Sequence, residues 1–208
     1  EDESPGRFFK SPWSCSGRGV FCAQGLSRKV LLNKTAGIIH RQGSVMAERG
    51  YRKVAEFGAL YECDTDGAKF RGLSMFLTEA RGAYTGNIVA PQDYFFGRID
   101  ALGLLRQLED ATRQLEDVLA PMITPYYKGW LGIDMMAYEG DDGMTHLHPC
   151  IELNLRMTMG VAAMKIAYRL SPTRPMLMSW QRAATTDNTP TLLKPREGFA
   201  LTLTDLNP

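Results

Sequence analysis

The chain has 208 residues, of which 44% are hydrophobic, and its formal net charge is +1. This hydrophobic content excludes a disordered chain. The near-neutral charge excludes a long-range field that would recruit nucleic acid or an anionic membrane surface. No apolar run approaches the roughly 20 residues that a membrane-spanning helix needs. The length predicts one compact domain or two small lobes.

The ends and the cysteines give expectations about the cellular context. The four cysteines form no C-x-x-C pair, and the first residues are acidic and polar, unlike a signal peptide. We therefore expect reduced thiols in a cytoplasmic protein. The sequence does not begin with methionine, so we expect a processed chain or a fragment of a longer protein.

Strand patterns dominate the first eighty residues. The sequence DTDG at residues 64–67 ends in Asp-Gly, which is a strong hairpin signal. Gly43 separates two short apolar pieces, and we expect a strand in each. The expected strands are 8–10, 20–23, two short pieces within 38–47, 54–62 and 69–78.

One long helix is predicted next. From Ile99 the apolar residues recur in steps of three and four as far as Met122, and Pro121 and Pro125 are expected to end the helix. Two strands follow around a turn at 139–143, then a helix over 158–170, and then two more strands near the end of the chain. Strands with many hairpin connections mixed with helices predict an α+β protein with antiparallel sheets.

The late hairpin carries the most chemistry. Because side chains alternate between the faces of a strand, Leu131, Ile133 and Met135 are expected in the core and Asp134 on the opposite, polar face. On the second strand, the odd positions from 147 to 153 are apolar and the even positions are polar. The polar positions are His146, His148, Cys150, Glu152 and Asn154. An antiparallel pairing that keeps the core faces together brings Asp134 within a residue or two of Glu152.

This polar face has three interpretations. Two carboxylates and an amide from Asp134, Glu152 and Asn154 offer the oxygen ligands that Mg²⁺ prefers. His146, His148 and Cys150 offer ligands for zinc instead. The third interpretation is a solvated face whose charges serve solubility alone. The Asn beside Glu and Asp favours the magnesium site.

A Gly/Ser-rich loop near the start adds a second feature. In FFKSPWSCSGRGVF, residues 8–21, backbone N–H groups free of Cβ obstruction can converge on phosphate oxygens. Lys10 and Arg18 can add positive charges. The P-loop pattern is absent, and a flexible surface loop is the alternative. Together with a magnesium face, the loop predicts a nucleotide enzyme.

Three segments of the chain resemble the ATP-grasp superfamily. FFKSPWSCSGRGV is similar to its lysine strand and glycine-rich lid loop, and GWLGIDMMAY is similar to the strand that supplies an aspartate. IELNLR matches the E-x-N-x-R signature of biotin carboxylases and their relatives at Glu152, Asn154 and Arg156. The resemblance spans most of residues 8–170. It implies a two-lobed fold with antiparallel sheets flanked by helices.

The resemblance also implies roles for particular residues. Lys10 would contact the nucleotide phosphates, and Arg156 would stabilise charge at the reacting centre. Asp134, Glu152 and Asn154 would hold Mg²⁺ between the β- and γ-phosphates. The residues that would close over the phosphates are Ser14, Ser16, Gly17, Arg18 and Gly19. The residues near the base and ribose would be Ala47, Glu48, Arg49 and Glu56.

The implied function is that of an ATP-dependent carbon–nitrogen ligase with ATP and Mg²⁺ as cofactors. A small carboxylate or peptide would be activated as an acylphosphate for attack by an amine. The alternative is a nucleotide-binding module without ligase chemistry. Residues 1–47 would form part of a small nucleotide-lid lobe and 48–208 the larger lobe with the metal hairpin. An N-terminal lobe of the family has no counterpart here, so the chain would be a fragment or another chain would supply that lobe. A homo-oligomer is the alternative expectation for its partners.

Overall fold

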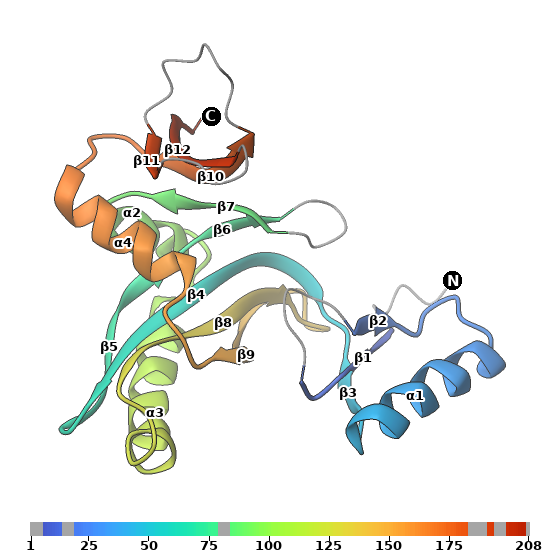
Figure 1. The fold of residues 1–208 in the computed structure, drawn as a ribbon. Helices are drawn as coiled ribbons and strands as arrows, with labels where there is room; N and C mark the ends of the chain where they lie inside the picture. Colours follow the sequence, from blue (N-terminus) through green and yellow to red (C-terminus); the bar gives the residue numbers. More distant parts are fainter. Residues whose placement is uncertain (1–5, 14–18, 79–83, 183–190, 194–198, 207–208) are drawn as a thin grey trace.

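The computed structural model describes residues 6–13, 19–78, 84–182, 191–193 and 199–206. These ranges form twelve strands and four helices, and every pairing between strands is antiparallel. The predicted α+β class with antiparallel sheets and flanking helices is therefore confirmed. The strands make three sheets (Figure 1). No helix of the described ranges is long and apolar enough to cross a membrane.

The smallest sheet has the order β2-β1-β3 and lies at the start of the chain. Strands β1 (Arg7–Lys10) and β2 (Val20–Cys22) are the predicted hairpin around the Ser/Gly loop. Strand β3 (Met46–Arg49) pairs with the other side of β1, so it is an edge strand. The helix α1 (Arg28–Gln42) joins β2 to β3.

Two short strands were predicted within residues 38–47, on either side of Gly43. The first of them is wrong, because α1 occupies the residues before Gly43. The Ser27 hydroxyl caps the helix by accepting from the Val30 N–H, and Gly43 ends it with φ 80°. Of the residues of α1, Ile38 alone is buried. The helix therefore lacks the apolar stripe that would have marked it in the sequence.

The four-stranded sheet, with the order β5-β4-β8-β9, is the centre of the molecule. The hairpin of β4 (Arg52–Asp64) and β5 (Gly67–Ser74) confirms the predicted turn, in which the Asp66 N–H donates to Asp64 Oδ1. The hairpin of β8 (Gly129–Glu139) and β9 (Thr145–Asn154) is also as predicted. The strands β4 and β8 pair along most of their length.

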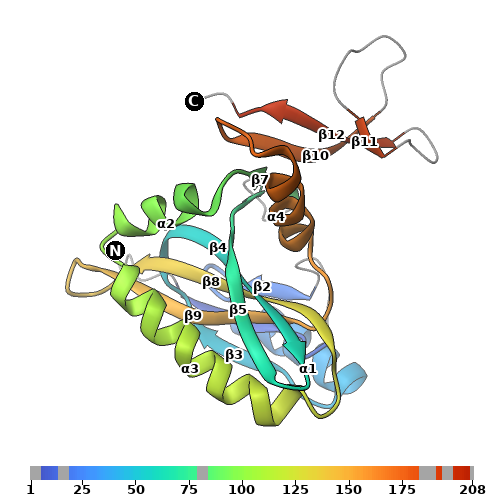
Figure 2. The same cartoon turned by 90° about the vertical axis from the view of Figure 1, so that its left-hand side faces the viewer.

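Two helices cover one face of this sheet (Figure 2). They are α2 (Gln92–Asp100) and α3 (Leu105–Ile123), so the prediction of a single helix from Ile99 is wrong at its start. The chain breaks between them at Gly103, where φ is 71° and glycine adopts the left-handed backbone without strain. The helix α3 also continues past Pro121, which was expected to end it.

The third sheet, with the order β11-β12-β10-β7-β6, packs against α4 (Met159–Leu170). The helix confirms the prediction for residues 158–170, and β10 and β12 confirm the two late strands. The strands of this sheet are β6 (Phe76–Thr78), β7 (Tyr84–Val89), β10 (Met176–Arg182), β11 (Thr191–Leu193) and β12 (Phe199–Asp205). Figure 1 shows β10, β11 and β12 above α4, whereas β6 lies beside β4 of the central sheet.

The end of α4 gives a test of local backbone strain. Ser171 has φ 44°, and it is the one non-glycine residue with positive φ in the described ranges. Ser171→Gly should raise the free energy of unfolding by about 1 kcal/mol, because glycine reaches this backbone without a Cβ penalty. Urea unfolding measures the change. Ser171→Val is the control and should be destabilising; the same stability for all three proteins would contradict the assignment.

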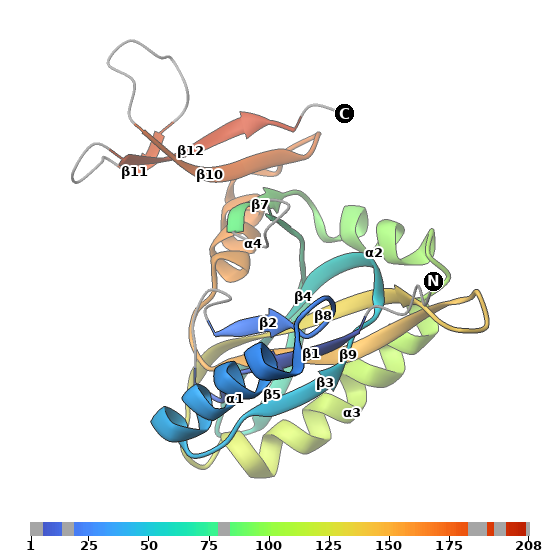
Figure 3. The ribbon, with the colours of Figure 1, turned by 90° about the vertical axis from the view of Figure 1, so that its right-hand side faces the viewer.

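The central sheet has two unlike faces. Leu131, Ile133 and Met135 are buried against α2 and α3, as the alternation of side chains predicted. The opposite face looks toward the small sheet, which lies across β8 and β9 from α3 (Figures 1 and 3). The core against α2 and α3 therefore fixes the sheet from one side, and the opposite face carries both a smaller buried cluster of Leu60, Val161 and Met164 at α4 and the polar residues of the late hairpin.

Candidate functional site

The acidic residues of the late hairpin meet on the open face of the central sheet. Asp134 on β8 is the direct register partner of Glu152 on β9, as expected from the sequence. On its other side Asp134 is paired with Gly58 of β4. A Cβ at Gly58 would lie 3.9 Å from Asp134 Oδ1 and 2.9 Å from Ser74 Oγ, so glycine leaves space beside the carboxylate.

A chain of hydrogen bonds links the acidic pair to the signature arginine. The Asn154 amide donates to Asp134 Oδ2 at 3.2 Å, and Arg156 Nη2 donates to Asn154 Oδ1 at 3.1 Å. The structure thus brings together four of the predicted site residues: Asp134, Glu152, Asn154 and Arg156. Because Asn154 is bonded on both sides, its position depends on Asp134 and Arg156 together.

The electrostatics of Asp134 favour a bound cation. Burial raises its pKa to about 6, and the neighbouring charge of Glu152 and the more distant one of Glu56 add to the rise, against the hydrogen bond from Asn154 and the charge of Arg156. The two carboxylates therefore repel each other on a partly desolvated surface. A divalent cation between them would relieve this repulsion. The oxygen donors of the face fit Mg²⁺.

The paired even positions of β9 face even positions of β8, as the alternation predicts, but the spacing between them is irregular. Asp134 pairs with Glu152, but Met136, two residues along, pairs with His148, so β9 contains a bulge that includes Cys150. His146 bonds instead to Asp142, with Nε2 2.9 Å from Oδ2. No group of three or more His, Cys, Asp or Glu side chains in the described ranges is placed to hold a metal. His146, His148 and Cys150 thus form no such group in the described ranges.

The small sheet presents an ion pair toward β9. Lys10 Nζ lies 2.5 Å from Glu48 Oε2, and their side chains are 19% and 32% exposed. Partial burial lowers the pKa of His148, which the charge of Glu48 raises and that of Lys10 lowers. Burial also raises the pKa of the Cys150 thiol, on which the same two residues act. Lys10 and Glu48 therefore face β9 across the space between the two sheets.

His148 packs within the protein on the polar face of β9, where the sequence left a zinc ligand and a solvated residue as alternatives. Its Nδ1 is buried and has no hydrogen-bond partner among the described residues. Its ring lies edge-on to Tyr51, with the ring centroids 5.4 Å apart. Protonation would add a second N–H donor to this ring, so the surroundings favour neutral imidazole. No sequence signal distinguished this packing role from a ligand role.

The predicted nucleotide-contacting residues lie in several places. Glu56 pairs with Lys53, at 2.7 Å between Nζ and Oε2, and it lies close enough to affect Asp134. Ala47 and Glu48 belong to the edge strand β3, and Gly19, the last glycine of the Gly/Ser-rich stretch, has φ 79°. Ser14, Ser16, Gly17 and Arg18 lie outside the described residues.

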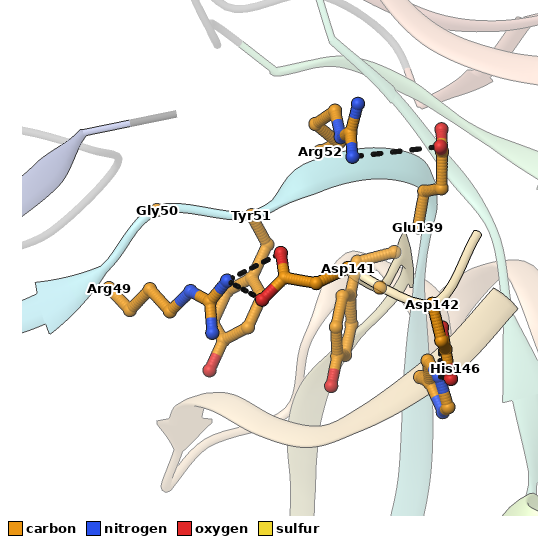
Figure 4. Close-up of a pocket in the computed structure, with 10 residues that line it drawn as sticks. Arg49, Gly50, Tyr51, Arg52, Glu139, Asp141, Asp142 and His146 are labelled. Carbon is orange, nitrogen blue, oxygen red and sulfur yellow. Dashed lines mark hydrogen bonds and ion pairs between the residues drawn. The ribbon is translucent and has the colours of Figure 1, made fainter. Parts of the chain in front are cut away.

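Arg49 is the next residue after Glu48 on β3, and its side chain has a different partner. Its guanidinium reaches Asp141 in the turn between β8 and β9, and this contact borders a cavity of about 370 Å³ (Figure 4). The cavity is lined by Arg49, Gly50, Tyr51, Arg52, Tyr138, Glu139, Gly140, Asp141, Asp142 and His146. The Arg49 side chain is therefore engaged with the turn between β8 and β9, although it remains 60% exposed.

Comparison with solved structures identifies the arrangement of these sheets. The carboxyaminoimidazole ribonucleotide synthase of Aspergillus clavatus, complexed with ATP, superimposes with a TM-score of 0.56 at 13% identity over 97% of this chain. The biotin carboxylase domain of the Hydrogenobacter thermophilus 2-oxoglutarate carboxylase, in complex with MgADP and bicarbonate, gives 0.56 at 10% identity over 97%. The biotin carboxylase of Campylobacter jejuni gives 0.53 at 10% identity over 96%.

The chain has the ATP-grasp fold. The resemblance drawn from the residues is thereby confirmed at the level of fold. No protein-family model and no curated protein sequence matches the chain. The chain spans only 58%, 53% and 52% of these three proteins, about half of each. In the ATP-grasp fold of this chain, the small sheet lies opposite the acidic face of the central sheet (Figure 3).

Proposed function

We propose that this ATP-grasp chain binds Mg-ATP between its small sheet and its central sheet and activates a substrate carboxylate for attack by an amine. One observation carries the proposal. The hydrogen-bonded set of Asp134, Asn154 and Arg156, with Glu152 beside it, lies on the sheet face that the Lys10–Glu48 pair overlooks. The structural neighbours complexed with ATP and MgADP support a nucleotide as the ligand.

The roles of the charged residues follow from where negative charge would develop. Asp134, Glu152 and Asn154 would hold Mg²⁺, which neutralises charge on the β- and γ-phosphates. Lys10 would contact the phosphates as a point charge. Before nucleotide binds, its ion pair with Glu48 holds the ammonium group in place. Arg156 would stabilise the charge on the transferred group, because its Nη2 is held by Asn154 beside the acidic pair.

The reaction balances without a cofactor beyond Mg-ATP. A carboxylate oxygen attacks the γ-phosphorus, the bond to the bridging oxygen breaks, and ADP leaves. The amine then forms a bond to the acyl carbon as phosphate leaves, and the amine loses one proton. A dedicated general base is not required for the first step, so catalysis consists mainly of positioning and electrostatic stabilisation. The substrate that carries the carboxylate would be a small carboxylic acid, an amino acid or a peptide.

Calorimetric titration with ATP in the presence and absence of Mg²⁺ tests the binding step. We expect measurable affinity that depends on Mg²⁺, because the Asp134–Glu152 pair would repel the phosphates without the cation. A phosphate-release screen across carboxylates with amines tests the chemistry. Binding with no release on any acceptor would favour the alternative, a nucleotide-binding module without ligase activity. No binding of ATP would contradict both functions.

A further inference from the structure

Gly50 and Tyr51 link β3 of the small sheet to β4 of the central sheet, and we call this link the hinge. One ion pair spans it. Arg49 Nη2 donates to both carboxylate oxygens of Asp141, at 2.8 Å to Oδ1 and 2.6 Å to Oδ2. The two residues are 92 positions apart in the chain. Among the ion pairs of the described residues, no other joins the part before Gly50 to the part after it. The pair therefore bears on the angle between the two sheets.

Aromatic packing beside this pair fixes the hinge segment itself. The Arg49 guanidinium lies 5.7 Å from the centre of the Tyr51 ring. Tyr51 in turn packs on Tyr138, with the ring centroids 4.3 Å apart, and on His148 at 5.4 Å. Figure 4 shows Arg49 and Tyr51 beside the carboxylate of Asp141. The contacts thus run from β3 through the hinge to β8 and β9.

The packing connects the hinge to the candidate site. His148 lies on β9 at the register position opposite Met136, two residues along β8 from Asp134. The charges of Glu48 and Lys10 also act on the pKa of His148, the first raising it and the second lowering it. A change in the position of Tyr51 would therefore move the small sheet relative to the acidic face, and Lys10 would move with it.

We propose that Arg49, Tyr51 and Asp141 form a hinge latch, a set of positioning residues that hold Lys10 over the Asp134–Glu152 pair. The nucleotide readout of this inference rests on the proposed function. Without the latch, the small sheet turns about Gly50 in the free protein, and binding of nucleotide must restore the closed arrangement. Loss of the latch should weaken nucleotide affinity more than it slows the chemical step. Once the nucleotide is bound, the protein without the latch makes the same contacts to the phosphates as the protein with it.

Charge substitutions at the two ends of the latch test it. The side chains are 60% and 79% exposed, so the pair is screened by salt and its effect is modest. We expect Asp141→Asn to weaken Mg-ATP binding roughly two- to fivefold at low salt, with kcat within about twofold. Asp141→Arg and Arg49→Asp should each weaken binding more, and the double variant that exchanges the charges should return to within about twofold of the wild-type affinity.

The matched control is Asp142→Asn. Asp142 is the adjacent carboxylate, but it pairs with His146 four residues away within the same turn and not with the small sheet. The affinity of this variant should equal that of the wild type. In roughly 0.5 M salt the difference between Asp141→Asn and the wild type should shrink, because the Debye length falls to roughly 4 Å.

Hydrogen–deuterium exchange of the nucleotide-free proteins gives a readout independent of ATP. We expect faster exchange of the amides in β3 and the hinge for Asp141→Asn than for the wild type and Asp142→Asn. Unchanged exchange together with unchanged affinity would overturn the latch. So would an exchanged-charge variant as weak as the single ones. Wild-type protein that fails to bind ATP would overturn the proposed function, and the exchange result would then decide the latch alone.

Discussion

Replacing Glu152 by Gln should lower Mg²⁺-dependent nucleotide turnover by at least about a hundredfold, which corresponds to a loss of about 3 kcal/mol of transition-state stabilisation. Glutamine keeps the shape of the side chain and removes one of the two charges that would hold Mg²⁺. Glu152 is exposed, and it is not part of the core. The fold should therefore survive the change, so a loss of turnover would report on the site. Phosphate release with and without Mg²⁺ measures the effect.

The control for this substitution is Glu62→Gln. Glu62 is also a glutamate of the central sheet, but it pairs with Arg71 between β4 and β5, away from the acidic pair. The turnover of this variant should stay within about twofold of the wild type. Thermal unfolding of both variants should match that of the wild type. Turnover of Glu152→Gln equal to that of Glu62→Gln would remove Glu152 from the proposed metal site.

The same substitution has an electrostatic consequence at the neighbouring carboxylate. The charge of Glu152 contributes to the raised pKa of Asp134, so the neutral amide of the Glu152→Gln variant would let that pKa fall toward its ordinary value. A single carboxylate with Asn154 still offers oxygen ligands, but the attraction for a divalent cation is weaker. Weakened Mg²⁺ binding should therefore accompany the loss of turnover.

The acidic pair could be predicted from the sequence because it depends on local alternation. Leu131, Ile133 and Met135 mark the core face of one strand, and this pattern alone places Asp134 on the other face. Pairing within one hairpin then brings Glu152 opposite Asp134. The bulge around Cys150 also has a local signal, because Pro149 lacks the N–H that a regular ladder needs, although the pattern of apolar residues alone does not give the two extra residues.

The missed elements lack the signals on which sequence interpretation depends. Most of α1 is exposed, so its apolar residues do not recur with a helical period, and only its caps at Ser27 and Gly43 identify it. The break between α2 and α3 was hidden because the periodicity of apolar residues continues across Gly103. Buried Leu104 maintains the pattern through the break.

The hinge contacts are of a different kind. Arg49 and Asp141 are surface residues in segments with no shared pattern, and each is an ordinary charged residue in its own stretch of sequence. Their meeting depends on the angle between two sheets, which no local propensity fixes. A site within one hairpin can therefore be predicted from a sequence more readily than a contact between two sheets.

Phe57→Ala should lower the free energy of unfolding by about 3–5 kcal/mol, because it removes a fully buried aromatic side chain and leaves a cavity. Phe57 has 0% exposure and lies in the cluster between the central sheet and the helices α2 and α3. Since a domain is stable by only about 5–15 kcal/mol, this loss is a large share of the total. Urea unfolding of both proteins measures it.

Phe199→Ala is the control with the same chemical change. Phe199 is 47% exposed on β12, so its loss should cost under about 1 kcal/mol. Equal losses for the two variants would contradict the placement of the core. Phe57 also lies between Glu56 and Gly58 on β4, with its side chain on the face away from the acidic pair. Under conditions where Phe57→Ala remains folded, its affinity for Mg-ATP should therefore stay within a few fold of the wild type. This would separate the face that stabilises the sheet from the face proposed to bind the nucleotide.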